Sequence, residues 1–514
     1  MKFDNLLLNT DVYKLSHMRM YAPGTTKVYS YLCARAGKRV DNRVSATLKQ
    51  LMEIGAIKEV DREAIEAKMA ENHSQGADEV VFFGLQYLLE EYFSKPITLE
   101  HAEEFFQTHQ SICGEVPEDV RTKILALVEL GYLPLEIKAI PEGTKVPVKN
   151  ALLTITNTNL DFPWVVGYVE SLLLKLWNSI TVATVSNEYR TLVDDAFNQS
   201  VDEDVFFLRD FSVHDFGYRG SGSEESAAVE GMAHLLSFTG SDDVIAHQIA
   251  TKTYGAVVGN ELIMASVPAS EHSVMCSYGE ENEFDAFKNI LDLYPTGIVS
   301  IVSDTYNIWN VITDFLPRLK SQIMARDGKT VLRPDSGNPE YIICGDPNAE
   351  PGTPAAKGCL VLLDELFGHT INSKGYKVLD SYVGLIYGDG MYLARYKRTL
   401  DRMEAMGYAA NNLVIGVGGI LRNNTRDTLG FAIKATYVEV DGVARNISKN
   451  PITDTGKKSH KGLMALLKDA DGKFYTKDCC TPEEEKTGFL KTAFLDGKVV
   501  NKTTLAEMRN RLNG

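Results

Sequence analysis

The second half of the chain repeats one pattern: a short apolar run, a burst of Asp, Arg or Gly, and then a stretch with helical spacing. "GIVSIVSDTYN" ends its β-branched run at Asp304, and the following "NIWNVITDFLPRLKSQIMAR" places apolar residues on one helical face. Later runs end in the same way in "TVLRPDSGNP", "YVGLIYGDG" and "NNLVIGVGG", with helical stretches around 359–368 and 391–406, while the earlier "VFFLRDFSVHDFGYRGSGS" fits less cleanly. Continuous apolar runs alternating with helices predict a parallel sheet covered on both faces.

The two ends of the chain show a different pattern. Residues 44–73 and 99–130 are charged and rich in Ala, Leu and Glu, which predicts helices. "LPLEIKAIPEGTKVPVKNALLTITNT" alternates between apolar and polar residues, and "FAIKATYVEVDGVARNISK" has a hairpin signal at "DG", so both predict antiparallel strands. We therefore expect an α/β fold, with an irregular parallel α/β barrel at 185–424 and a flanking α+β domain formed by both chain ends, 1–184 and 425–514.

Composition and charge narrow the class of protein. The chain has 514 residues, 44% of them hydrophobic, which is enough for a large buried core. Its formal net charge of −16 repels nucleic acid and anionic membranes, so neither is expected as a partner. Neither a signal peptide nor a membrane span is evident, and seven scattered cysteines do not suggest a disulfide framework, so we expect a cytoplasmic protein.

The polar bursts fall at the predicted C-terminal ends of strands, where barrels of this type gather their functional groups. Arg333 and Asp335, together with Asp304 and Asp389, suggest a site for a phosphorylated sugar, with arginine for the charge and aspartates for hydroxyls and Mg²⁺. Each burst alone could equally end its element. Four similar units in series favour a shared site.

Two glycine-rich stretches could bind ligands. "GVGGIL" at 416–421 would let backbone N–H groups approach an anion, although glycine turns after strands are common. "HDFGYRGSGS" places Phe216 and Arg219 between glycines. There the ring could stack on a flat ligand and the arginine could hold a phosphate, or the pair could be a core aromatic and a solvated cation.

The stretch "ASVPASEHSV" is too polar for a core and contains His272 directly after Glu271. A lone histidine is often only a polar group whose tautomer a neighbour fixes. No G-x-S-x-G motif accompanies it, so a Ser-His-Asp triad is not supported. If the strand ends converge, His272 faces Asp304 and Asp335, and carboxylates in that place favour a nucleophilic histidine.

Eleven motifs in order along nearly the whole chain resemble those of the nicotinamide phosphoribosyltransferase family. They are "NTDVYKLSHMRMYAPGTTKVYSY", "FFGLQYLLEEY", "LPLEIKAIPEG", "ITVATVSNEYR", "HDFGYRG", "TGSD", "SVPASEHS", "VSDTYNIWN", "LRPDSGNP", "YGDG" and "NTRD". The resemblance implies a type II phosphoribosyltransferase fold in a homodimer with shared active sites. It also implies that nicotinamide and 5-phosphoribosyl-1-pyrophosphate (PRPP) give nicotinamide mononucleotide and pyrophosphate in pyridine nucleotide and NAD biosynthesis, with Mg²⁺, and that ATP drives the reaction.

The same resemblance implies a role for each matching residue. Phe216 would stack on nicotinamide, with Tyr13 of the partner subunit on the other face, and Asp242 or the adjacent Asp243 would accept from the amide. His272 would be phosphorylated by ATP, with Asp304 and Asp335 near it, the ribose and Mg²⁺. The substrate and its phosphates would be held by Arg219, Arg333, Gly388, Asp389, Gly419 or Gly418, and Arg426, with Arg35, Lys457, Lys458 and Lys461 on the pyrophosphate and ATP side.

Two segments depart from the family pattern. The stretches at about 37–78 and 340–359 are longer than in the animal enzymes, and we expect both to form surface loops.

Three other functions compete with the main hypothesis. A nicotinate phosphoribosyltransferase would share the fold and the PRPP site. A phosphosugar lyase or epimerase would need a Schiff-base lysine or a metal-binding histidine cluster. A non-enzymatic binding protein on the same fold would have lost some of the site residues.

Overall fold

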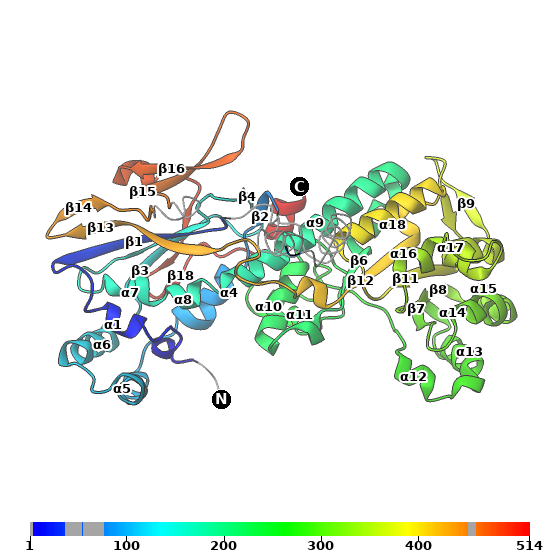
Figure 1. The fold of residues 1–514 in the computed structure, drawn as a ribbon, viewed down its shortest axis with the longest axis horizontal. Helices are drawn as coiled ribbons and strands as arrows, with labels where there is room; N and C mark the ends of the chain where they lie inside the picture. The colour runs from blue at the N-terminus through cyan, green and yellow to red at the C-terminus, as the bar shows by residue number, and fades with distance from the viewer. Residues whose placement is uncertain (1–3, 36–53, 55–76, 451–458) are drawn as a thin grey trace.

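The computed structural model describes residues 4–35, 54, 77–450 and 459–514. It has two lobes along the long axis, an antiparallel sheet with its helices on the left of Figure 1 and a parallel sheet with its helices on the right. The first sheet takes its strands from both chain ends and the second from the middle. The predicted α/β class, with an irregular parallel barrel and a flanking α+β lobe, is confirmed.

The antiparallel sheet has seven strands in the order β14-β13-β1-β5-β3-β17-β18. Its predicted hairpin forms where Asp441 and Gly442, with φ of 53° and 73°, turn the chain between two strands. Positive φ at both central residues is what a tight two-residue turn requires. The strands are β14 Val443–Asn446, β13 Ala432–Val440, β1 Thr25–Cys33, β5 Leu153–Asn157, β3 Leu135–Ala139, β17 Lys491–Leu495 and β18 Lys498–Val499.

Short helices and strand pairs surround this sheet. The helix prediction for 99–130 is confirmed as two helices separated at Gly114 and Pro117, whereas 44–73 lies, apart from residue 54, outside the described residues. The helices are α1 Lys14–His17, α4 Leu85–Leu88, α5 Leu99–Cys113, α6 Glu118–Leu130, α7 Trp164–Tyr168, α8 Glu170–Leu173, α19 Pro482–Glu485 and α20 Leu505–Asn513. Two antiparallel pairs accompany them, β2 Glu79–Val81 with β4 Lys145–Pro147 and β15 Leu463–Lys468 with β16 Phe474–Cys480.

The parallel sheet has five strands in the order β6-β12-β11-β8-β7, and every neighbouring pair is parallel. All five C-terminal ends therefore meet at one edge of the sheet. The strands are β6 Val213–Asp215, β12 Leu413–Val417, β11 Val383–Tyr387, β8 Asp327–Arg333 and β7 Thr296–Val302. The predicted strand runs are confirmed, including the short β6 in the unit that fitted less cleanly.

Irregular segments close the barrel between its two edge strands. Ser241 bridges to Asp215 at the end of β6, and Gly240 bridges to Ala265. Four residues later, Ala269 bridges to Ser300 of β7 on the other edge. The polar stretch before His272 therefore runs across the open side of the sheet, which explains why it is too polar for a core and yet has a fixed place.

Helices cover the outside of the barrel. The long helix α9 (Leu176–Ser200) lies at the junction of the two lobes and crosses the predicted domain boundary at 184/185. The domain limits themselves stay a prediction. The others are α10 Glu224–His234, α11 Ala246–Lys252, α12 His272–Cys276, α13 Glu283–Leu293, α14 Ile308–Asn310, α15 Leu316–Ala325, α16 Pro339–Cys344, α17 Pro354–Phe367 and α18 Leu393–Ala405. A small hairpin, β9 His369–Ile371 with β10 Lys377–Leu379, extends the barrel lobe.

The expectation of a surface loop at 340–359 is wrong. The segment contains α16 and the start of α17, and Ile343, Cys344 and Cys359 are buried in the barrel-side core. Both helices begin with a side-chain cap followed by proline, Asn338 before Pro339 and Thr353 before Pro354. The connection between the two helices is a loop, and Gly358, with φ of 77°, interrupts the start of α17.

Each lobe has its own apolar core, and a third cluster joins α9, α10 and α20. None of the helices in the described part of the chain is both long enough and apolar enough to span a bilayer. The seven cysteines are all free thiols.

Candidate functional site

The C-terminal edge of the parallel sheet brings together side chains that are far apart in the sequence. Because the strands are parallel, the residues that follow them line one edge in spatial rather than sequence order. In that order they are Phe216 and Arg219 after β6, Gly418 and Gly419 after β12, Gly388 and Asp389 after β11, Arg333 and Asp335 at and after β8, and Asp304 after β7.

His272 lies at the start of α12, against the ends of β7 and β8. Its Nδ1 is 3.1 Å from Thr305 Oγ1, and its Nε2 is 3.6 Å from Asp335 Oδ2 and 4.0 Å from Asp304 Oδ1. The predicted convergence of His272 with the two aspartates is therefore present. The side chain is 44% exposed, so a reactant can reach the ring from solvent.

The two aspartates are fixed to one another. Asp304 Oδ2 accepts from the backbone N–H groups of Asp335 and Ser336 at 2.8 and 2.6 Å. Burial raises the pKa of Asp335, and the nearby Asp304 raises it further, whereas Arg333 lowers it. Gly388 allows this arrangement, because a Cβ there would lie 2.1 Å from Asp335 Oδ1. The carboxylates are thus held together at the cost of mutual repulsion, which a bound cation would relieve.

These carboxylates fit a divalent cation held jointly with a substrate. Asp304 Oδ1 is buried and has no hydrogen-bond partner among the described residues, and carboxylate oxygens are the ligands that Mg²⁺ prefers. Within the described ranges, no three His, Cys, Asp or Glu side chains gather closely enough to hold a metal by themselves. Any cation at this edge would need oxygens from the substrate or from water to complete its shell.

Aromatic side chains lie at the ends of β6 and β12. Phe216 lies directly over Gly416, where a Cβ would be 2.1 Å from Phe216 Cε2. The ring of His214 approaches edge-on with a centroid distance of 6.2 Å, and burial lowers the pKa of His214 to about 4, so this histidine is neutral at pH 7. Asp242, which contributes a further carboxylate, is exposed, and its Oδ1 accepts from Ser266 Oγ at 2.5 Å.

The neighbouring Asp243 has a different environment. Its side chain is completely buried and pairs with Arg422, with Oδ2 3.3 Å from Nη2. Burial and the nearby Asp215 together raise the pKa of Asp243 to about 6, although Arg422 lowers it. Of the two adjacent aspartates, only Asp242 can reach a ligand.

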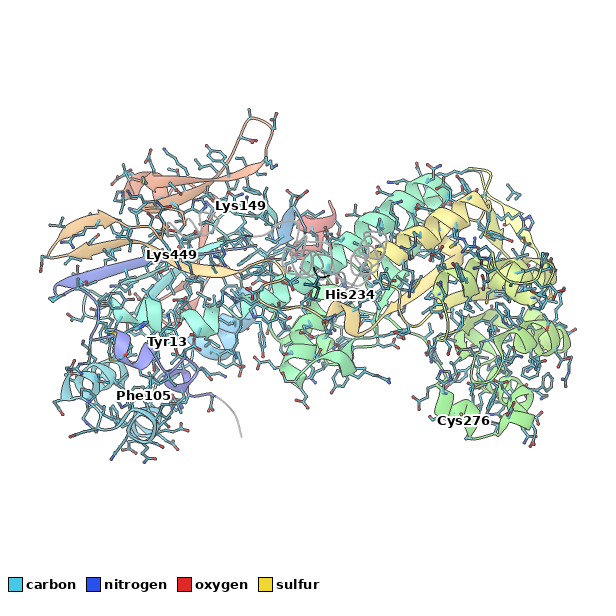
Figure 2. All side chains as sticks on the ribbon, in the orientation of Figure 1. Tyr13, Phe105, Lys149, His234, Cys276 and Lys449 are labelled. Atoms are coloured by element: carbon cyan, nitrogen blue, oxygen red, sulfur yellow. The ribbon has the colours of Figure 1, made fainter. Side chains whose placement is uncertain are left out.

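Some predicted residues lie apart from this edge. Tyr13 is 57% exposed on the antiparallel lobe, across the molecule from Cys276 at the end of α12 (Figure 2). Lys461 lies on that lobe too, and its backbone N–H donates to Asp478 Oδ2 at 3.2 Å. Arg35 follows β1, where its Nε donates to Gly430 O at 2.8 Å. Lys457 and Lys458 lie outside the described residues.

The loop after β12 continues to Arg426, whose Nη1 donates to Phe431 O at 3.4 Å. Arg35 and Arg426 thus bind carbonyls at the two ends of one short segment, 430–431. Nearby, burial lowers the pKa of Lys434, and Arg35 and Lys449 lower it further. This cationic group lies where β13 begins.

Several residues at the site carry no signal in the sequence. Thr305 and Ser266 are ordinary polar residues whose contacts with His272 and Asp242 join segments more than 20 residues apart. Arg422 pairs with Asp215 across 207 positions, and nothing in its sequence neighbours marks it as buried. Lys434 lies inside a predicted strand, and the sequence alone predicts that its side chain faces solvent. Only the strand-end rule could have directed attention to Thr305, which follows Asp304.

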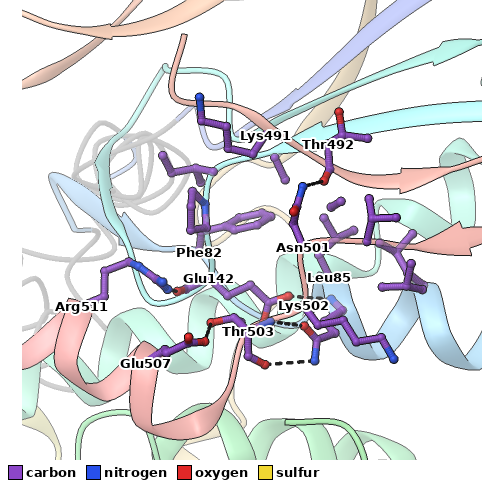
Figure 3. Close-up of a pocket in the computed structure, with 18 residues that line it drawn as sticks. Phe82, Leu85, Glu142, Lys491, Thr492, Asn501, Lys502, Thr503, Glu507 and Arg511 are labelled. Carbon is purple, nitrogen blue, oxygen red and sulfur yellow. Dashed lines mark hydrogen bonds between the residues drawn. The ribbon is translucent and has the colours of Figure 1, made fainter. Parts of the chain in front are cut away.

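A separate cavity of about 430 Å³ lies away from the strand ends, between α4, β3, β17 and α20 (Figure 3). Glu142 lies at its floor and accepts from the N–H groups of Gly84 and Gln86 and from Tyr254 OH. Burial raises the pKa of this carboxyl. None of the site residues predicted from the sequence lines this cavity, so it carries no argument for the chemistry at the strand ends.

Comparison with known proteins shows the family and the fold of the chain. The family model described as the nicotinate phosphoribosyltransferase (NAPRTase) family matches residues 211–498, and the model described as the nicotinamide phosphoribosyltransferase N-terminal domain matches residues 5–137. A protein of Acinetobacter baylyi named nicotinamide phosphoribosyltransferase is 39% identical over 99% of this chain and 97% of its own length. One of the same name from Xanthomonas campestris pv. campestris is 36% identical over 98% and 97%. The crystal structure of human nicotinic acid phosphoribosyltransferase superposes with a TM-score of 0.51 at 15% identity, covering 98% of this chain and 93% of that chain, which shows the likeness of fold.

Proposed function

The chain belongs to the nicotinate phosphoribosyltransferase family, and we propose that it transfers the 5-phosphoribosyl group of PRPP to nicotinamide, giving nicotinamide mononucleotide and pyrophosphate for the salvage of NAD. The observation that carries this proposal is the likeness, over almost the whole chain, to relatives named nicotinamide phosphoribosyltransferase. The exposed Asp242 beside Phe216 supports the choice of the amide over the acid, because a carboxylate accepts from an amide N–H and repels a second carboxylate.

The reaction requires the protein to position the two substrates and to neutralise the charge of the leaving group, and it does not require a general base. The bond from ribose C1 to the pyrophosphate oxygen breaks, and the lone pair of the pyridine nitrogen forms the new bond to C1. That nitrogen carries no proton at neutral pH, so none has to be removed. Catalysis rests on aligning the nitrogen with C1 and on neutralising the leaving group.

Phe216 would hold the nicotinamide ring by stacking, and Asp242 would hold its amide. The edge-on His214 remains neutral, so it adds no charge to an uncharged ligand. We propose that Tyr13 of the partner subunit covers the other face of the ring in a homodimer. In support of this, Tyr13 is exposed and lies on the antiparallel lobe, whereas Phe216 follows β6 of the parallel sheet.

Asp304 and Asp335 would hold the ribose and, with the substrate's own oxygens, Mg²⁺. When bound, Mg²⁺ would neutralise charge on the leaving pyrophosphate. Gly388, Asp389 and the glycines at 418–419 would receive the ribose and the 5′-phosphate, and Arg219 and Arg333 would bind phosphate beside the ring. Arg35, Arg426, Lys461, Lys457 and Lys458 would meet the remaining phosphates, which an acidic chain attracts only through such local cations. Arg35 and Lys461 lie apart from this edge in one chain, so in this proposal the homodimer would bring them to it.

ATP would act through His272. A ring nitrogen of His272 would attack the γ-phosphorus of ATP, the bond from that phosphorus to the bridging oxygen would break, and ADP would leave with the electron pair. Thr305 and the two aspartates would orient the ring. A cytoplasmic location is part of the same proposal.

The first test is the formation of nicotinamide mononucleotide from PRPP and Mg²⁺, with nicotinamide and nicotinate compared and ATP present or absent. We expect product from nicotinamide and an increase in rate with ATP. Product from nicotinate alone would refute the assignment of the base, and an ATP-independent rate would refute the coupling. His272→Ala should abolish the increase with ATP. His369→Ala is the matched control, because His369 also pairs with a carboxylate, Asp364, but lies on the outer hairpin.

The dimer has its own test. Tyr13→Ala and Phe216→Ala should each remove most of the activity, and mixing the two variants should restore part of it, because a mixed dimer has one site with both rings intact. If the mixture is no more active than either variant alone, the two rings do not share a site across subunits.

A further inference from the structure

A guanidinium enclosed by three carboxylates lies beneath the loops that bind the base. Arg422 Nη2 is 2.7 Å from Asp215 Oδ2 and 3.3 Å from Asp243 Oδ2, and Arg422 Nε is 2.9 Å from Glu230 Oε2. All four side chains are buried, with exposed fractions of 2, 0, 0 and 5%. Buried ion pairs add little net stability, because desolvation offsets their attraction. Buried ion pairs do fix the relative positions of the strands, helices and loops that carry the paired side chains.

Two of these carboxylates belong to the loops that present the base-binding residues. Asp215 immediately precedes Phe216, and its Oδ1 accepts from Gly217 N at 2.8 Å. The backbone oxygen of Asp215 accepts from Asp242 N at 2.9 Å. Asp243 follows Asp242 directly, so the carboxylate that pairs with the guanidinium is adjacent to the one that faces the ligand. The ring and the amide acceptor are therefore attached to one buried charge.

Arg422 itself belongs to the glycine loop after β12, and its guanidinium also contacts the loop that follows Arg219. The backbone N–H of Arg422 donates to Gly419 O at 2.9 Å, and its Nε donates to Ser221 Oγ at 3.2 Å. Ser221 Oγ in turn donates to Glu230 Oε2 at 2.5 Å. A Cβ at Gly220 would lie 2.9 Å from Gly419 Cα, so the two loops are packed directly together. Three loops thus converge on one side chain.

We propose that Arg422 is a positioning residue of the base pocket, whose planar guanidinium holds the loops bearing Phe216, Asp242 and Gly419 in the arrangement that binds nicotinamide. The proposal rests on the proposed function. The guanidinium presents donors in several fixed directions, and here they reach carboxylates from β6, from α10 and from the 241–243 loop. A lysine keeps the charge but concentrates it at one nitrogen, so it cannot span the three carboxylates.

The charges of the cluster agree with a role in geometry. Three carboxylates face one guanidinium, so the acidic side chains outnumber the cation, and burial raises the pKa of Asp243 to about 6. His234 does not balance the carboxylates. This histidine is completely buried, and burial lowers its pKa although Asp215 raises it. The guanidinium of Arg422 is therefore the cation that compensates the charge of these carboxylates.

The test compares full-length Arg422→Lys with the wild type in the nicotinamide mononucleotide assay. We expect the KM for nicotinamide to rise about ten- to hundredfold, the effect of losing charge-assisted hydrogen bonds, while the KM for PRPP changes less than about threefold. Arg326→Lys is the matched control. Arg326 is also a buried arginine of the barrel, but it donates to Tyr294 O, Gly297 O and Thr330 Oγ1 at the opposite ends of the strands. It should lower Tm without changing the KM for nicotinamide.

A second variant covers the case in which Arg422→Lys does not fold. In Gly217→Ala the new Cβ would lie 2.9 Å from Arg422 Cζ and 2.8 Å from Asp215 Oδ1, so it displaces the guanidinium without removing a charge. It should show the same selective rise in the KM for nicotinamide. The proposal is overturned if both KM values stay within twofold of the wild type, or if they rise together in step with the loss of Tm, as a merely structural role would give. If the wild-type enzyme uses only nicotinate, the proposed function is wrong. The positioning role of Arg422 is then tested through the KM for nicotinate in place of the KM for nicotinamide.

Discussion

The contact between Phe216 and Gly416 gives the sharpest prediction for the base pocket. Gly416 is the fourth residue of β12, and the Phe216 ring lies over it. In Gly416→Ala the new Cβ would be 2.1 Å from Phe216 Cε2 and 2.2 Å from Cδ2. Ordinary contact begins at 3.4 Å, so the ring has to move away from β12 by roughly 1.3 Å.

The size of the effect follows from that displacement. Forcing one extra carbon into a packed contact costs about 1–3 kcal/mol. If the ring relieves the clash by moving into the ligand space, nicotinamide has to push it back on binding and loses the same free energy. Because 1.4 kcal/mol is a factor of ten, the KM for nicotinamide should rise about 5- to 150-fold. The KM for PRPP should change little, because Asp335 and Gly388 follow other strands.

Steady-state kinetics with each substrate varied in turn measures this split. Gly222→Ala is the matched control, because a Cβ at Gly222 meets nothing within 4 Å, and this variant should keep both KM values. A Gly416→Ala enzyme with wild-type Tm and an unchanged KM for nicotinamide would refute the reasoning. That result would mean that the ring does not hold the base.

Three further predictions test other parts of the structure. Asp242→Asn should lower the ratio of kcat/KM for nicotinamide to that for nicotinate by at least about tenfold, because the carboxylate no longer repels the acid, and competition between the two bases in one assay measures the ratio. Gly388→Ala places a Cβ 2.1 Å from Asp335 Oδ1, so we expect the KM for PRPP to rise at least about fivefold with the KM for nicotinamide little changed. Burial raises the pKa of Glu188 from 4.5 to about 8, so its contribution to stability is complete below pH 4.5 and is lost as pH rises through 8. The Tm of Glu188→Gln minus that of the wild type should therefore grow between pH 4.5 and pH 7, by an amount equivalent to about 3 kcal/mol, and parallel curves would contradict the shift.

The sequence predicted the part of the site that depends on strand ends. An apolar run followed by a polar burst marks where a parallel strand ends, and parallel strands end at one edge. For that reason Asp304, Arg333, Asp335 and Gly388 could be placed together before their distances were known. The convergence of His272 with the two aspartates followed from the same rule.

The sequence could not show which loops pack against one another. The distance between Gly416 and Phe216 depends on β12 lying beside β6, a pairing of strands 200 residues apart. Arg422 looks like any arginine after a glycine turn, and only the fold encloses it. The segment 340–359 was expected to be a surface loop because it is longer than in the animal enzymes, whereas the caps at Asn338 and Thr353 begin helices there.

The floor of the site is built from positions without side chains. Adjacent strands β12 and β11 each contribute a glycine near the C-terminal edge, and each glycine is covered by a side chain from the strand on its outer side. Phe216 after β6 covers Gly416, and Asp335 after β8 covers Gly388. Because β11 and β12 are neighbours, the ring proposed to hold the base and the carboxylate proposed to face the ribose lie over two adjacent strands at the same edge. A methyl group at Gly416 would displace Phe216 and one at Gly388 would displace Asp335, so we expect the affinity for each substrate to depend on a different glycine.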